Sequence, residues 1–170
     1  MRAFLIIIFF CISTQLYSQE ILIPGTNLKV EMPNDKWSLT NTQDNNTMTI
    51  YYYKREPIED SLGRQVIPNI SIIKESNSGM DVVTYSAMKR SQMPAIDIEK
   101  IFIPKDIKMK YKNGIGYLGY YSDKYGKHKV YIMFLNDGDV GLRIICDVMY
   151  ELFEQVDKEF VDMFKSISQN

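Results

Sequence analysis

The chain has 170 residues, of which 45% are hydrophobic and 24% charged, and its formal net charge at pH 7 is −1. A chain of about 150 residues can bury ~70% of the surface that its unfolded form exposes, which is enough for one hydrophobic core. The near-neutral charge argues against a nucleic-acid-binding protein, because such a protein needs a basic surface.

Residues 1–18 have the order of a secretory signal peptide. Arg2 supplies the positive start, residues 4–12 form an apolar run, and a short polar tail ends at Ser18. The run is too short for a membrane span, which needs about 20 residues. We therefore predict cleavage after Ser18 and a single exported domain at 19–170, periplasmic or extracellular, with no further membrane span.

Cleavage would also remove Cys11, so Cys146 would be the one cysteine of the mature chain. A single cysteine excludes an intramolecular disulfide. Its place on the apolar face of a predicted strand indicates a small buried hydrophobic residue and not a catalytic thiolate. The exported domain would then be stabilised by its core alone.

The first half of the mature chain alternates short apolar stretches with turn signals. Residues 21–23 are an apolar lead-in, and Trp37, the only tryptophan, is expected to anchor the core. We predict strands at 28–32, from Trp37 to Leu39, and at 48–53, 69–73, 98–103 and 107–111, with a polar loop at 41–46 and a longer loop at 57–68.

A helix is predicted at 81–93 between these strands. Asp81 is suited to cap its first turn. Val82, Tyr85 and Met88 recur at helical spacing, which favours a helix with one apolar stripe.

The second half, from Gly114 to Ile167, predicts three long strands closed by a helix. The strands are expected at 114–123, 128–137 and 140–148, with a tight turn at Asp137-Gly138. The strand at 128–137 is apolar on both faces, which indicates an interior strand covered on both sides. The helix at 151–167 carries one apolar stripe. Its members are Leu152, Val156, Phe160, Met163, Phe164 and Ile167.

This order of elements predicts an α+β fold. No strand–helix–strand alternation recurs, which argues against a doubly wound parallel sheet. We expect a largely antiparallel sheet of about six to eight strands, with a mid-chain helix and a C-terminal helix packed on it.

The layout between residues 21 and 168 resembles the PsbP-like superfamily. The resemblance rests on Pro33 and Trp37 after the first strand, on Gly114 before the long hairpin, and on the final Phe164-Lys165-Ser166-Ile167. It implies an α-β-α sandwich around an antiparallel sheet. It also implies binding of other proteins without a common enzymatic activity, and no functional residue is transferred from it.

The sequence offers no catalytic or metal-binding constellation. His128 is the only histidine, and it has no Cys or His partner at the spacing of a zinc site. Asn136, Asp137 and Asp139 fit a turn better than a calcium loop, which needs more carboxylates and a closing glutamate. Glu56, Glu59 and Asp60 are interpreted as a solvated loop. We therefore expect no metal and no cofactor.

Tyrosine is the residue type that points to binding, because it is favoured at interfaces. Strand propensity and core packing are the competing explanation for tyrosines in strands. Our first hypothesis is an exported, non-catalytic module that binds another envelope or secreted protein through Tyr51, Tyr53 and Tyr121.

A second hypothesis is a carrier of small apolar ligands. Its pocket would lie between sheet and helices and would be lined by Phe102, Tyr120 and Phe134. A hydrolase that uses His128 is the third. The oligomeric state is not addressed by any of these patterns.

Overall fold

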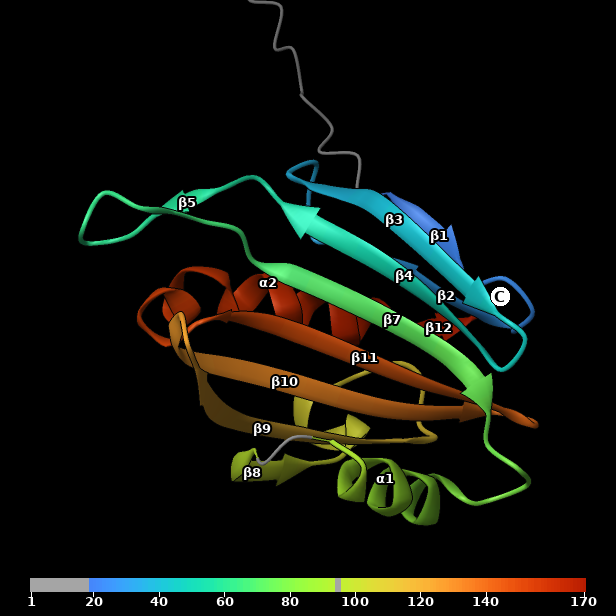
Figure 1. Ribbon diagram of the computed structural model, residues 1–170. Helices are drawn as coiled ribbons and strands as arrows, with labels where there is room; N and C mark the ends of the chain where they lie inside the picture. The colour runs from blue at the N-terminus through green and yellow to red at the C-terminus, as the bar shows by residue number, and fades with distance from the viewer. Residues whose placement is uncertain (1–18, 94–95) are drawn as a thin grey trace, which may run out of the picture.

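The computed structural model describes residues 19–93 and 96–170, so the predicted signal peptide at 1–18 lies outside the described residues (Figure 1). The main element of the fold is a seven-stranded sheet with the order β3-β4-β7-β11-β10-β9-β8, and each neighbouring pair of strands is antiparallel. The strands are β3 (Trp37–Asn45), β4 (Met48–Arg55), β7 (Asn69–Ser76), β8 (Asp97–Phe102), β9 (Gly114–Asp123), β10 (Gly126–Asp137) and β11 (Val140–Met149).

Two smaller sheets and four helical segments complete the described chain. A three-stranded sheet has the order β1-β2-β12, and a two-stranded ladder joins β5 and β6. Their bounds are β1 (Glu20–Leu22), β2 (Leu28–Glu31), β12 (Ser168–Gln169), β5 (Ile58–Glu59) and β6 (Gln65–Val66). The helices are α1 (Val82–Ser91) and α2 (Phe153–Ser166), and the 3-10 turns are η1 (Pro104–Ile107) and η2 (Tyr150–Leu152).

The two α-helices lie on opposite faces of the main sheet (Figure 1). The larger core unites α2, the β1-β2-β12 sheet and one sheet face, whereas a second core unites α1 with β9 and β10 on the other face. The α+β prediction is confirmed, with a mostly antiparallel sheet, a mid-chain helix and a C-terminal helix.

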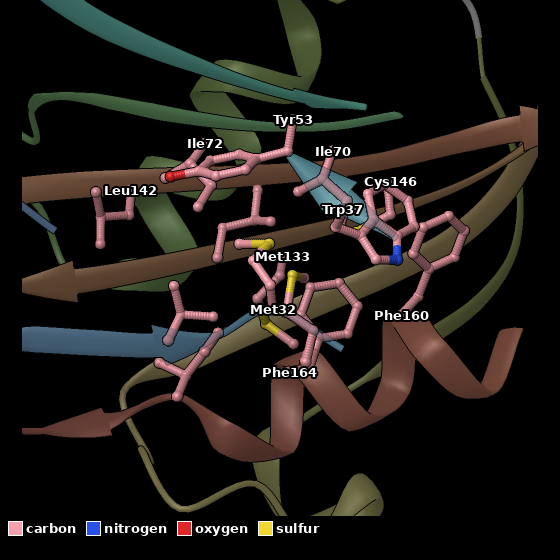
Figure 2. Packing of buried hydrophobic residues seen from close by; sticks show 14 of the residues in the cluster. Met32, Trp37, Tyr53, Ile70, Ile72, Met133, Leu142, Cys146, Phe160 and Phe164 are labelled. Carbon is pink, nitrogen blue, oxygen red and sulfur yellow. The ribbon is translucent and has the colours of Figure 1, made fainter. Parts of the chain in front are cut away.

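The C-terminal helix is held by the apolar stripe that the sequence predicts. Figure 2 shows Phe160 and Phe164 pointing from α2 into the larger core, where Phe160 lies beside Trp37 with ring centroids 5.8 Å apart. All six residues of the predicted stripe are buried. Burying six such side chains contributes roughly 1.5–3 kcal/mol each before conformational entropy is subtracted.

The prediction of an interior strand apolar on both faces is confirmed for β10. Met133 and Leu135 belong to the core under α2, whereas Ile132 and Phe134 belong to the core under α1. Adjacent residues of a strand point to opposite faces, so one strand supplies both cores.

Trp37 and Cys146 are both buried in the larger core, as the sequence predicts. Burial raises the pKa of the Cys146 thiol well above its usual range, so the thiolate is disfavoured.

The polar loop predicted at 41–46 is wrong, because β3 continues to Asn45 and the hairpin turn lies at residues 46 and 47. Eight of the nine residues of β3 are exposed, and only Trp37 is buried. A strand without a buried face has no alternation of apolar and polar residues, so the usual signal is missing.

The strand predicted at 107–111 is also wrong. Residues 104–107 form a 3-10 turn, and Lys108 takes a left-handed conformation with φ 57°. Beyond it, Tyr111 donates its backbone N–H to Ile167 (3.0 Å) and its hydroxyl to the Asn136 carbonyl. The alternating side chains therefore fit a packed connection and not a ladder.

Candidate functional site

An apolar groove runs between β1 and the outer strands of the main sheet. It has a volume of about 180 Å³ and lies on the face that α2 covers elsewhere. Its lining comes from residues 21–24 at the N-terminus and from β3, β4 and β7. The lining residues are Ile21, Leu22, Ile23, Pro24, Leu39, Tyr51, Tyr53 and Ile72.

The groove has a buried floor and an exposed rim. Ile23, Tyr53 and Ile72 are buried. Leu22 and Leu39, one on each strand that flanks the groove, are each 51% exposed. Exposed leucines scattered over a surface need no explanation, but two on the rim of one apolar groove mark a candidate binding site.

The wall that carries Leu22 is fixed by the β1–β2 turn. Ile23 donates its N–H to the Leu28 carbonyl (2.9 Å), and Gly25 has φ +77°, a conformation that glycine adopts without strain. Lys74 donates from Nζ to the Pro24 carbonyl at 2.9 Å, which ties the turn to β7. The groove is therefore formed in advance of any binding.

Tyr51 is one of the two tyrosines that line the groove. Burial, together with the nearby Asp44 carboxylate, raises the pKa of the Tyr51 hydroxyl, so the group stays neutral and available as a donor. The groove thus combines an apolar lining with the hydroxyls of two tyrosines, Tyr51 and Tyr53, a combination suited to an aliphatic or aromatic side chain of a partner.

The structure places the three predicted binding tyrosines on different faces. Tyr51 and Tyr53 line the groove together. Tyr121 packs against the core on the α1 side, so it does not share a surface with them. Consecutive residues of one strand alternate between faces, and Tyr52 between the two groove tyrosines points to the other face.

The residues predicted to line a ligand pocket do not come together either. Phe102 belongs to the larger core, where its ring meets Tyr131 edge to face. Phe134 belongs to the core under α1. Tyr120 lies edge to face with Tyr150, and Lys127 sits over its ring at 3.7 Å from the centroid. The sheet itself separates Phe102 from Phe134.

His128 has partners that the sequence reasoning missed. Its Nδ1 lies 3.0 Å from Asp147 Oδ1, and its Nε2 lies 3.4 Å from Asp123 Oδ1. Tyr121 stacks on the imidazole with ring centroids 4.8 Å apart and donates its hydroxyl to Asp147 Oδ2 at 2.7 Å. Burial and this hydrogen bond raise the pKa of Tyr121, so the hydroxyl remains a donor.

This cluster joins β9, β10 and β11 through Tyr121, His128 and Asp147. Among the described residues, no serine, threonine or cysteine side chain bonds to His128, so a nucleophile beside the base is missing. The register of the β9–β10 and β10–β11 hairpins is the signal that would have found Tyr121 and Asp147 from the sequence.

A larger, open groove of about 690 Å³ lies at the opposite end of β3, between the β3–β4 and β10–β11 turns. Its charged residues have both signs, Asp44, Glu75 and Asp139 against Lys74, and Glu75 is already bonded by Lys89 and Tyr85. Such a lining suits water better than one class of ligand. Within 19–93 and 96–170, no group of three His, Cys, Asp or Glu side chains is placed to hold a metal ion.

No helix in the described part of the chain is long and apolar enough to cross a membrane.

No protein-family model matches the chain, and no curated protein matches it significantly. Solved structures do match. LpqN of Mycobacterium tuberculosis, described as involved in cell envelope biogenesis, has a TM-score of 0.53 at 9% identity over 91% of either chain. A point mutant of the protein Mog1 has a TM-score of 0.50 at 12% identity, covering 91% of this chain and 96% of Mog1.

The chain shares the fold of LpqN and Mog1. A Bacteroides thetaiotaomicron protein also matches, with a TM-score of 0.49 and 9% identity, but the chain spans only 48% of its length. Identities this low show the fold alone, since one fold hosts many functions.

Proposed function

We propose that this protein is a non-catalytic accessory module of the cell envelope that binds another protein through the apolar groove. The observation that carries the proposal is the pair of half-exposed leucines, Leu22 and Leu39, on the rim of a groove whose floor is already buried. Burying one aliphatic side chain of a partner there contributes about 1.5–3 kcal/mol. The groove is smaller than the ~300–1,000 Å³ of typical ligand pockets, which favours a partner's side chain over a carried molecule.

The envelope setting rests on two separate supports. Residues 1–18 have the composition of a secretory leader, and LpqN, which has the same fold, is described as involved in cell envelope biogenesis. N-terminal sequencing of the protein from its host tests the first: export predicts a mature chain that begins at Gln19, and a retained Met1 in the cytosolic fraction contradicts it.

The binding surface is tested by site-specific photo-crosslinking in the host cell. A benzophenone amino acid at position 39 should give a light-dependent adduct with one defined protein. The same amino acid at position 101 is the matched control, because Ile101 is 57% exposed and lies on the opposite edge strand, β8. Equal adducts at both positions, or none at position 39, would show that the groove is not the binding surface.

A further inference from the structure

Strand β3 leaves one edge of its backbone without a partner in the described chain. It is the last strand on its side of the sheet, and its backbone pairs with β4. No other backbone hydrogen bond of residues 37–45 is found among the described residues. A free strand edge presents a row of N–H and C=O groups, which is a template for another extended chain.

The two edges of the sheet differ in how they are protected. Proteins block unwanted pairing with short edge strands, charged side chains and bulges. Strand β8 is six residues long and carries Asp97, Glu99 and Lys100. Strand β3 is nine residues long and has no charged residue from Trp37 to Gln43, although it contains a bulge between Leu39 and Asn41. The β3 edge therefore lacks the charge protection that β8 has.

The groove lies next to this free edge. Leu39 belongs to β3 and also forms the groove rim opposite Leu22. In an added strand, the residue opposite Leu39 would point to the same face as Leu39, with Cβ atoms about 5 Å apart. An apolar side chain at that position would enter the groove, while its neighbours would face the other way.

The charged residues at the two ends of β3 favour different residue types at the two ends of an added strand. Lys36 precedes the strand and Lys54 lies opposite Ser38, while Asp35 and Glu56 lie beside Lys36, so both signs of charge are present at the start of β3. Asp44 lies near the end. Within the described residues, Lys36 and Lys54 form no ion pair with a carboxylate. An acidic residue of the partner is favoured at the first end and a basic residue at the second.

We propose that the partner supplies an extended segment that pairs antiparallel with β3 as an eighth strand and places one apolar side chain in the groove. This inference rests on the proposed function. The segment alternates apolar and small polar residues. It carries an acidic residue near its C-terminus and a basic residue near its N-terminus, because its C-terminal end lies beside Lys36. Hydrogen bonds between the main chains of β3 and the segment supply affinity for any extended peptide, and the groove supplies specificity for one apolar side chain.

The test uses residues 19–170 and a nine-residue acetylated and amidated peptide, in which valine and threonine alternate between an N-terminal lysine and a C-terminal glutamate. At roughly ten times its Kd, the peptide should slow hydrogen exchange about tenfold at alternate amides of β3, those not bonded to β4. A second peptide, methylated on the alternate backbone nitrogens that would face β3, should not bind. Slowed exchange at β8 instead, or equal binding of the methylated peptide, would overturn the proposal.

Leu39→Lys should abolish the protection, whereas Ile101→Lys, an equal change on the opposite edge, should leave it unchanged. Both substitutions lie at exposed positions and should leave the core intact, and unchanged unfolding midpoints would verify this. The experiments distinguish a failure of the strand-addition proposal from a failure of the proposed function. A specific adduct at position 39 without any protection of β3 amides would keep the groove as a binding surface and reject strand addition.

Discussion

Arg55 and Glu159 form a two-pronged ion pair between β4 and α2, with Nε 3.0 Å from Oε2 and Nη2 3.0 Å from Oε1. The Arg55 and Glu159 side chains are only 11% and 18% exposed. Trp37 donates its indole N–H to the same carboxylate at 2.7 Å. The C-terminal helix is therefore joined to the start of β3 and the end of β4 by polar contacts as well as by its apolar stripe.

Glu159→Gln should destabilise the fold by about 2 kcal/mol, because hydrogen bonds to a buried charge contribute about 1.5–3 kcal/mol and Arg55 would lose its counter-charge. Urea unfolding followed by Trp37 fluorescence measures the change. Lys158→Gln, which removes an exposed ion pair with Asp162 on the same helix, is the control and should leave the midpoint unchanged. Equal midpoints for all three proteins would mean that the Arg55 pair contributes nothing.

The Glu159 carboxylate should also make the stability of the fold depend on pH. Burial raises the pKa of Glu159, but hydrogen bonds from Arg55 and Trp37 and the charge of Arg55 outweigh it, so the pKa is lowered from its ordinary value of 4.5. A carboxyl whose folded-state pKa is depressed stabilises the fold at pH values above its unfolded pKa. This contribution is lost as the pH falls through the folded pKa.

The stability difference between the natural chain and Glu159→Gln should therefore be constant from pH 7 down to about 5.5 and shrink below pH ~4.5, because an unfolded glutamate titrates near 4.3. Urea midpoints of the two proteins across this range give the difference directly. A difference that stays constant to pH 3 would show that Glu159 has no depressed pKa.

Gly116 should not tolerate a side chain, because a Cβ there would lie 2.2 Å from Phe102 Cζ. Gly116→Ala should cost about 1–3 kcal/mol, since overpacking forces neighbours out of their rotamers. The cost should be smaller when Phe102→Leu is already present, and a double-mutant cycle measures this coupling. Additive effects would show that the ring is not the obstacle.

Phe160→Ala should be among the most destabilising single changes, at about 3–5 kcal/mol, because it removes a fully buried ring. The ring lies beside Trp37 and Tyr131, with centroids 5.8 and 6.5 Å away. Calorimetry or denaturant unfolding measures the loss. Phe160→Leu, which keeps most of the apolar volume, should recover a large part of it, and no difference between the two variants would argue against a cavity as the cause.

Long periodic segments were the elements that the sequence predicted best. Strands β9 to β11 and helices α1 and α2 each have a buried face, and a buried face imposes a regular spacing on apolar residues. Strand β3 has no such face beyond Trp37, and the polar residues that make it look like a loop are the ones that solvent permits on an edge. The segment 107–111 shows the converse, because its alternating apolar residues, Ile107, Met109 and Tyr111, all pack against the larger core without forming a strand.

The sequence by itself determined the fold class, the interior position of β10, the burial of Cys146 and the anchoring of α2, since each depends on periodic burial within one segment. Only the tertiary structure decided which side chains share a surface. It joined Leu22 and Leu39 across an apolar groove, placed Tyr121 beside His128, and put Phe102 and Phe134 on opposite sides of the sheet. The physical reason is that such neighbours are set by strand order and by the face each residue takes, and neither can be read from the spacing of residues along one strand.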